Sequence, residues 1–185
     1  MAHQGADLPE YADDNLSSAS EAVRLLERHE PDSVVRALAN TIISRAFDEG
    51  LDGLTDAEAQ LAALEIYQCD TVTDGFASLF YNHADFIPAM LAATKRTGAS
   101  VAHELLVRGL TAIGLPETAA IEDINAASKE LLAAVDLAEE TPEGGEELLK
   151  AFSEFDGELE ERVEHLSDEM LALLKSATAE FKNFP

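Results

Sequence analysis

The chain has 185 residues, and 37 acidic side chains against 12 basic ones give it a formal net charge of −25. A charge of this sign excludes direct binding to DNA, RNA or anionic lipid, and it favours either a strongly basic partner or a salt-rich solvent. Apolar residues make up 46% of the chain, which is ordinary for a globular protein and argues against wholesale disorder. Cys69 is the only cysteine, so no intramolecular disulfide exists and a reducing compartment is expected.

The beginning of the chain carries acids and lacks the apolar segment of a secretory signal. No stretch approaches the roughly 20 apolar residues of a membrane span. We therefore expect a cytoplasmic protein without a membrane role. Residues 1–15 are expected to form a polar tail and residues 16–185 a single all-α domain, of about eight or nine helices.

Apolar residues recur at helical spacing along the chain, and no alternating β-branched run of useful length interrupts them. The first helix is expected over residues 17–29 and ends before Pro31. The second is expected to begin with Asp32 or Ser33 as its cap and to continue through Phe47.

The third helix is expected to begin with a capping box. Thr55 can accept a hydrogen bond from the backbone N–H of Glu58, and the Glu58 side chain can reach back to the N–H of Thr55. This helix is expected to end near Cys69, because residues 70–75 form the least helical stretch in the middle of the chain. The aromatic-rich segment 76–82 follows it.

Proline and glycine divide the remaining sequence. Pro88 is expected in the first turn of a helix, and Gly98 separates that helix from the next one. Further helices are expected over residues 101–113, 117–139, 148–155 and 159–181, with a loop at 139–145.

The acids are concentrated in two windows of the sequence. Residues 46–94 hold nine acids and no Lys or Arg, and residues 130–174 hold fifteen acids against Lys150 and Arg162. We expect the partner-binding surface to be drawn from these windows, with Asp48, Glu49, Asp52, Asp56, Glu139, Glu140, Glu143, Glu146, Glu147, Glu158, Glu160, Glu161, Glu164, Asp168 and Glu169 as its candidate residues.

The expected last helix shows the acidic pattern most clearly. Glu160, Glu164 and Asp168 recur at intervals of four residues, so on one continuous helix they would stack along a single face. Neighbouring carboxylates at this spacing lie about 5–6 Å apart, close to the spacing of phosphates along a DNA strand. Such a face could enter a basic groove, although a run of charge on one helix is more often only a solvated face.

Two short segments carry a recognisable motif. The segment 54–58 holds Thr55 and Glu58, and the segment 74–82 holds Gly75, Phe76, Phe80 and Asn82. Together they resemble the DNA-mimic protein family, in which a similar helix start precedes an Asn-Gly-Gly-Phe-x-Gln-Phe-Phe-x-Asn motif. Thr73, Asp74 and Ser78 stand here where the family has Asn, Gly and Gln. The resemblance extends over residues 52–184.

The resemblance implies an all-α fold, commonly dimeric, whose acidic surface imitates duplex DNA and occupies DNA-binding proteins such as transcriptional repressors. We interpret the motif as a structural turn packed by Phe76 and Phe80, and we expect Asn82 to cap a helix. The sequence therefore predicts a DNA mimic that occupies the basic nucleic-acid-binding surface of a partner such as a transcriptional regulator. No cofactor is expected.

No arrangement of residues supports an enzyme. Glu161, His165 and Glu169 share a spacing that could ligate a divalent ion, but such a coincidence is common in a helix this acidic. His83 near Asp85 is more typical of a surface hydrogen bond than of a polar site. Phosphate-binding loops, nucleophile elbows and metalloprotease motifs are absent from the sequence. We expect no catalytic and no metal-binding residues.

Two other functions agree with the same charge. One is a cytosolic protein of unrelated function in a salt-loving organism, for which the low lysine content is typical. The other is an acidic immunity protein that neutralises a basic nuclease toxin. Solvent adaptation should spread acids over the whole surface, whereas mimicry should gather them on one face.

Overall fold

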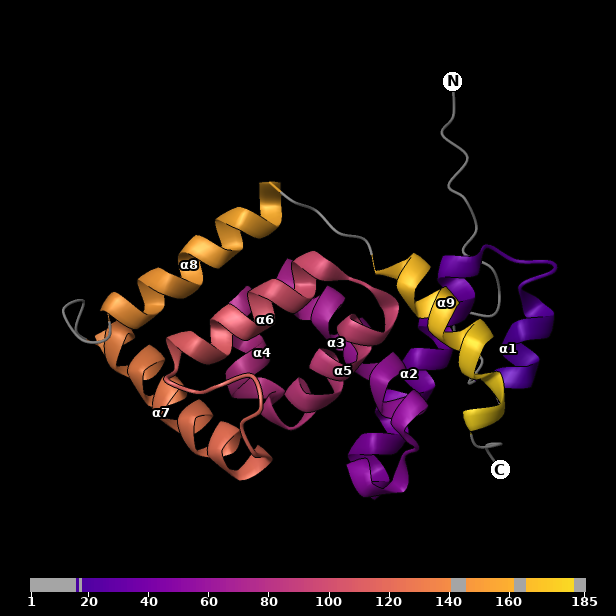
Figure 1. The fold of residues 1–185 in the computed structure, drawn as a ribbon, viewed down its shortest axis with the longest axis horizontal. Coiled ribbons are helices and arrows are strands. Elements are labelled where there is room, and N and C mark those ends of the chain that lie inside the picture. Colours follow the sequence, from indigo (N-terminus) through magenta and orange to yellow (C-terminus); the bar gives the residue numbers. More distant parts are fainter. Residues whose placement is uncertain (1–15, 17, 141–145, 162–165, 182–185) are drawn as a thin grey trace.

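A computed structural model describes residues 16, 18–140, 146–161 and 166–181 (Figure 1). Nine α-helices and no β-strand lie within these residues, which confirms the all-α class. In chain order the helices are α1 (Ala19–Leu25), α2 (Pro31–Glu49), α3 (Asp56–Thr73), α4 (Phe76–Asn82), α5 (Ile87–Thr97), α6 (Ser100–Ala112), α7 (Ile121–Glu140), α8 (Glu146–Glu161) and α9 (Ser167–Ala177). Three 3-10 turns join them: η2 (Leu51–Gly53), η3 (Ala84–Phe86) and η4 (Thr178–Glu180).

Helix α3 is the centre of the fold. Residues 61–67 are buried without interruption, so the middle of this helix is enclosed on every side. Helices α2, α4, α5 and α9 all pack against it. Because these neighbours come from the beginning, middle and end of the sequence, α3 joins the parts of the chain into one apolar core.

The second helix begins earlier than the sequence suggested. Pro31 is its first residue and Glu30 precedes it as the N-cap, so the expectation that Asp32 or Ser33 caps the helix is wrong. Proline suits this position because its φ angle matches the helix and the first backbone N–H groups have no intrahelical partner.

The predicted capping box of α3 is confirmed. The N–H of Thr55 donates to Glu58 Oε2 at 2.8 Å, and the N–H of Glu58 donates to Thr55 Oγ1 at 3.3 Å. The predicted end of α3 near Cys69 is wrong, because the helix continues to Thr73. Hydroxyls in its last turn bond to backbone carbonyls four residues earlier, as Thr73 Oγ1 does to Cys69 at 3.0 Å.

Gly75 separates α3 from α4 within residues 74–82, here called the central motif. Its φ of 81° lies in the region that favours glycine, and it is the N-cap of α4. The predicted packing by Phe76 and Phe80 is confirmed, since both are fully buried with ring centroids 5.8 Å apart. The prediction for Asn82 is wrong: it is the last residue of α4, and His83 follows as the C-cap.

The remaining boundaries agree with the sequence in part. Pro88 lies in the first turn of α5 and Gly98 ends that helix, as predicted. Gly98 takes the left-handed conformation, with φ 83°. Helix α7 begins at Ile121, four residues later than expected. No helix in the described part of the chain is long and apolar enough to span a membrane.

The expected helix over residues 159–181 is wrong. Helix α8 ends at Glu161, Leu166 precedes α9 in a non-helical conformation, and α9 begins at Ser167. Figure 1 shows the two helices separated along the long axis of the molecule. The apolar spacing continues across both because each helix packs its own apolar face, α8 against α4 and α6 and α9 against α2 and α3.

Candidate partner-binding surface

Four acids of the first window surround the turn between α2 and α3, here called the α2–α3 corner: Asp48, Glu49, Asp52 and Asp56. All four are exposed. Gly50 ends α2 with a φ of 83°, η2 follows, and the Thr55 capping box begins α3, so the chain reverses within a few residues. The corner therefore carries four exposed carboxylates, and none of the ion pairs among the described residues includes them.

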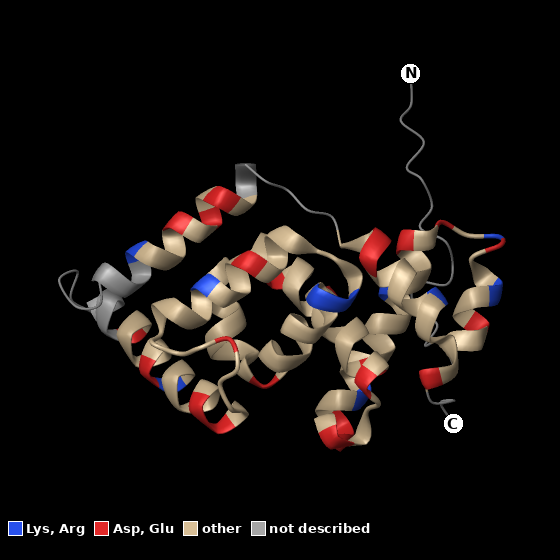
Figure 2. Cartoon of the chain, viewed as in Figure 1, with Lys and Arg blue, Asp and Glu red and all other residues tan. Residues whose placement is uncertain are grey.

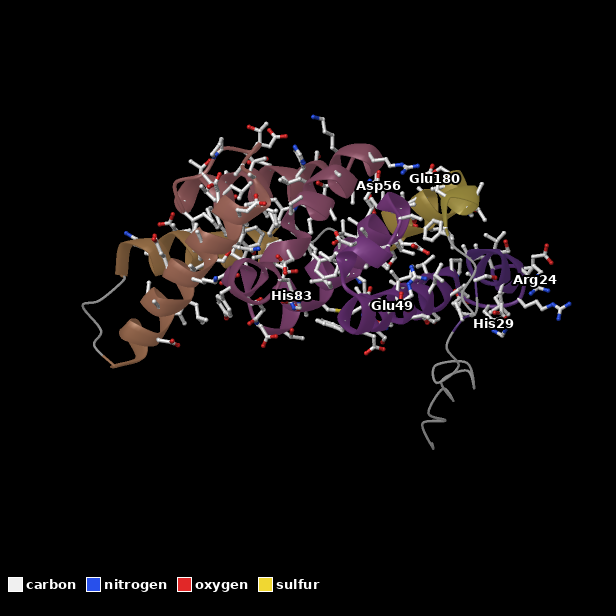
Figure 3. All side chains as sticks on the ribbon, turned by 90° about the horizontal axis from the view of Figure 1, so that it is seen from below. Arg24, His29, Glu49, Asp56, His83 and Glu180 are labelled. Atoms are coloured by element: carbon white, nitrogen blue, oxygen red, sulfur yellow. The ribbon has the colours of Figure 1, made fainter. Side chains whose placement is uncertain are left out.

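Two acids of the corner lie on different sides of the molecule. Figure 3 places Asp56 near Glu180 on one side of the molecule and Glu49 on the other. Arg96 lies on the Asp56 side, where its guanidinium contacts both carboxylate oxygens of Glu180 at 3.0 and 3.3 Å. The corner is thus an acidic projection that can be approached from two sides, rather than a flat acidic face.

Two acids of the first window are not on the surface. Glu58 is fully buried, with Oε2 2.6 Å from Nη2 of Arg45, and Glu65 is 2% exposed, with Oε1 3.0 Å from Nε of Arg36. Asp70 is partly buried and lies 3.2 Å from His83 Nε2. The window therefore presents fewer charges to a partner than its sequence contains.

Helix α8 uses two of its acids to bind the rest of the fold. Asp156 Oδ1 accepts a hydrogen bond of 2.6 Å from the N–H of Phe76, the first residue of α4. Glu158 accepts from both terminal nitrogens of Arg108 at 2.6 and 2.7 Å. Glu158 was a candidate for partner binding, but its carboxylate is committed to this bidentate pair.

Aromatic packing completes the attachment of α8. Phe152 and Phe155 are 2% and 5% exposed, and each packs against Phe76 with ring centroids 6.2 and 5.5 Å apart. The guanidinium carbon of Arg108 lies 4.9 Å from the centre of the Phe155 ring. Helix α8 therefore packs against the central motif, mainly through contacts with Phe76.

The predicted stack of Glu160, Glu164 and Asp168 is wrong. It requires one continuous helix, whereas Glu160 belongs to α8 and Asp168 to α9. Asp168 is exposed in the first turn of α9, and Glu169 beside it is half-buried. Acids suit this turn because the helix dipole favours negative charge at its N-terminus.

Other candidates of the second window fall in segments whose side chains the structure does not describe. The backbones of Glu139 and Glu140 end α7, and those of Glu146, Glu147, Glu160 and Glu161 lie in the first and last turns of α8. Glu143, Glu164 and His165 lie outside the described residues.

Acidic residues are distributed over most of the described ribbon. Figure 2 shows them on α8 and α7, at the α2–α3 corner, on α9 and on α1, with few basic residues between them. The two windows of the sequence do not merge into one acidic face in this view. The corner is one of the places where several described acids are both close in sequence and exposed.

Burial changes the acidity of two groups near the end of α3. It raises the pKa of Asp70, against the opposing influence of His83 and of the Ser78 hydroxyl. It also raises the pKa of the Cys69 thiol, as does the neighbouring Glu65 carboxylate. The Cys69 thiol therefore stays protonated at pH values above the ordinary pKa of cysteine, as expected of a structural thiol rather than a nucleophile.

The internal partners of the acids were not predicted from the sequence. Arg36 pairs with Glu65 at 29 positions and Arg108 with Glu158 at 50 positions along the chain, and Arg45 pairs with Glu58 on the next helix. Helical spacing carries no information about such pairs. The one available signal is the small number of cations. With 37 acidic residues and 12 basic ones, each basic side chain has several acids with which it could pair. Among the described residues, no group of three or more His, Cys, Asp or Glu is arranged to hold a metal ion.

Comparison with known proteins gives one match. Searches of curated proteins and of solved structures found none. A family model described as DMP19-like protein matches residues 52–182, which include the capping box, the central motif and the helix that the motif holds. The chain therefore belongs to the family of DMP19-like proteins, the DNA-mimic family that its central motif resembles.

Proposed function

We propose that this protein is a DNA mimic that occupies the basic nucleic-acid-binding surface of a partner such as a transcriptional regulator. The observation that carries the proposal is the family membership, shown by a match over residues 52–182 that begins within the α2–α3 corner. The exposed carboxylates of that corner supply negative charge without internal counter-ions, as a substitute for phosphates must. We assign no catalytic residue, and we include a homodimer in the proposal as expected of the family.

The α2–α3 corner is the part of the surface to which we assign partner contact. Asp48, Glu49, Asp52 and Asp56 are exposed, and they lie at the turn between two long helices. Exposed Asp168 at the start of α9 is a second candidate contact. Acids that bind α8 to the fold, above all Asp156 and Glu158, are excluded because a partner would have to displace their internal donors.

The spread of acids over the ribbon favours salt adaptation as a second candidate function (Figure 2). In that case the charge would be matched to concentrated salt and would have no specific partner. Raising KCl would then increase the free energy of unfolding up to molar concentrations, because screening relieves self-repulsion. A mimic should instead release its partner as salt rises.

The test is capture of partners on the immobilised full-length protein from lysate of its native host, with and without excess duplex DNA. We expect a nucleic-acid-binding protein that is retained at moderate salt and displaced by duplex. The purified partner is then titrated against a quadruple variant, Asp48→Asn, Glu49→Gln, Asp52→Asn and Asp56→Asn. Affinity should fall by about tenfold or more, equivalent to about 1.4 kcal/mol.

A control variant with the same change of net charge carries Glu27→Gln, Glu30→Gln, Glu122→Gln and Asp123→Asn, all exposed and outside both acidic windows. It should bind within about twofold of the unaltered protein. Equal losses in both variants would remove the corner from the contact surface. Capture of no basic protein, or of partners indifferent to duplex, would overturn mimicry, and capture of a nuclease toxin would identify an immunity protein.

A further inference from the structure

A pocket of about 290 Å³ lies between α7 on one side and the end of α4 and the start of η3 on the other. On one side it is lined by Asn125, Ser128, Lys129 and Leu132, which occupy positions i, i+3, i+4 and i+7 of α7 and so share one helix face. Asn82 and Asp85 line the other side. The volume is close to the lower limit of small-molecule sites, about 300 Å³.

This pocket presents charges of both signs. Asp85 and Lys129 both line it and are both exposed, so one negative and one positive charge face the same small volume. They are not joined in any of the ion pairs among the described residues. A pocket with one charge of each sign offers a counter-charge to each end of a ligand that carries both signs.

Polar and apolar groups around these charges support the same kind of ligand. Asn125 Nδ2 donates to Asp85 Oδ1 at 2.8 Å, which holds this carboxylate against α7. Ser128 is 4% exposed, and its hydroxyl has no hydrogen-bond partner among the described residues. Leu132 is 41% exposed and gives the pocket an apolar wall.

Asn82 connects the pocket with the central motif. The fold does not use its side chain as a helix cap, and the residue is exposed at the end of α4. An amide at this position can donate and accept, as a polar ligand requires. The pocket thus accounts for a motif residue that packing leaves unexplained.

We propose that this pocket binds a free α-amino acid in its zwitterionic form. Asp85 receives the ammonium group, Lys129 receives the carboxylate, and Leu132 contacts the side chain of the ligand. Opposite charges at the two ends fix its orientation, and the small volume favours a single amino acid over a longer peptide. This inference does not depend on mimicry, because it requires neither a protein partner nor DNA.

The test is titration of the full-length protein with each of the common L-amino acids. Binding is measured by isothermal titration calorimetry and by changes in the NMR chemical shifts of backbone amides. At least one amino acid should bind with a dissociation constant of about 1 mM or tighter. Its shift changes should concentrate in residues 81–85 and 125–132. Asp85→Asn and Lys129→Gln should each weaken binding by about tenfold.

Blocked ligands test each charge separately. The amide of the bound amino acid lacks the carboxylate, and its N-acetyl form lacks the ammonium group. Lys129→Gln should abolish the preference for acid over amide and retain the preference for free over acetylated amine, and Asp85→Asn should do the reverse. Asp123→Asn on α7 and Lys150→Gln on α8 are exposed and do not line the pocket, so they serve as matched controls.

Three results would overturn the proposal. The first is the absence of heat and of shift changes with every amino acid at about 10 mM, well above the expected dissociation constant. The second is binding that both pocket variants leave unchanged. The third is equal loss in the pocket variants and their controls, which would indicate a non-specific effect of charge.

Discussion

Two carboxylates on α3, Glu58 and Glu65, are buried, and each lies against an arginine of α2. The closer pair joins Glu58 Oε2 to Arg45 Nη2 at 2.6 Å, with the glutamate fully buried and the arginine side chain 14% exposed. A buried pair of this kind adds little stability compared with apolar residues of the same shape. Loss of one partner is costly, however, because the other charge then remains buried without compensation.

Arg45→Met should therefore lower the free energy of unfolding by about 3–5 kcal/mol. The double variant Arg45→Met, Glu58→Gln should recover most of this loss, since glutamine is neutral and still serves as the side-chain acceptor of the capping box. Urea titration followed by far-UV circular dichroism measures all three proteins.

Arg96→Met provides the matched control, because the Arg96–Glu180 pair leaves 33% and 50% of the two side chains exposed. Its effect should stay within about 1 kcal/mol. A loss as large as that of Arg45→Met would mean that removal of the arginine side chain, and not the uncompensated carboxylate, determines the cost.

At the scale of elements, the contact between α8 and α4 stabilises the start of α4 within the central motif. Helix α4 has seven residues, too few to be stable alone. Its first N–H is bound by Asp156 of α8, and a Cβ atom at Gly75 would lie only 3.2 Å from Asp156 Oδ2. The absence of a side chain at Gly75 thus lets the carboxylate approach the start of the helix.

Asp156→Ala should destabilise the fold by about 1–2 kcal/mol, the usual cost of removing a side chain that caps a helix. Asp156→Asn should cost less, because its amide oxygen can still accept from the N–H of Phe76. Glu154→Ala is the control: this exposed residue lies on the same helix and should change stability by less than about 0.5 kcal/mol. Equal stability of all three variants in urea titrations would contradict the assigned role of Asp156.

The helices that the sequence predicted well are those with local signals. The capping box needs only Thr55 and Glu58, and the end of α5 needs only Gly98, so both are visible within a few residues. The separation of α8 from α9 has no such signal. Apolar residues keep helical spacing from Leu159 to Phe181, yet the two helices pack on different parts of the fold, which only tertiary structure determines.

The candidate surface was predictable to a similar extent. Exposure of Asp48, Glu49, Asp52 and Asp56 follows from their place at the ends of helices. The internal use of Glu158 does not, because Arg108 is 50 positions away and its contact depends on how α8 lies against α6. The sequence gives the total number of acidic residues. The acids available to a partner are only those that are not paired with basic residues inside the fold.

At the scale of the whole molecule, part of the core comes from outside the family segment. The match begins at residue 52, yet α2 contributes Val35, Leu38 and Ile42, all fully buried. It also supplies the arginines that neutralise Glu58 and Glu65. Helix α2 is therefore a structural component of this protein, although the family match does not include it.

A chain that begins at residue 52 should accordingly fail to fold. It should show reduced helicity and no cooperative unfolding transition. Without α2, an apolar face of α3 is exposed to water, and Glu58 and Glu65 lose the arginines that neutralise them. Addition of a peptide spanning residues 16–50 should restore helicity in proportion to its concentration. A truncated chain with native circular dichroism and a sharp transition would show that α2 is dispensable.

The hydrogen bond from Phe76 to Asp156 spans 80 positions of the chain. During synthesis the ribosome adds about 5–20 residues per second, so the partner of Phe76 is made about 4–16 s after Phe76 itself. Throughout this interval the aromatic rings of Phe76 and Phe80 lack Phe152 and Phe155 as neighbours. The nascent chain thus exposes an apolar surface until α8 has emerged, and this surface is a place for chaperones to act.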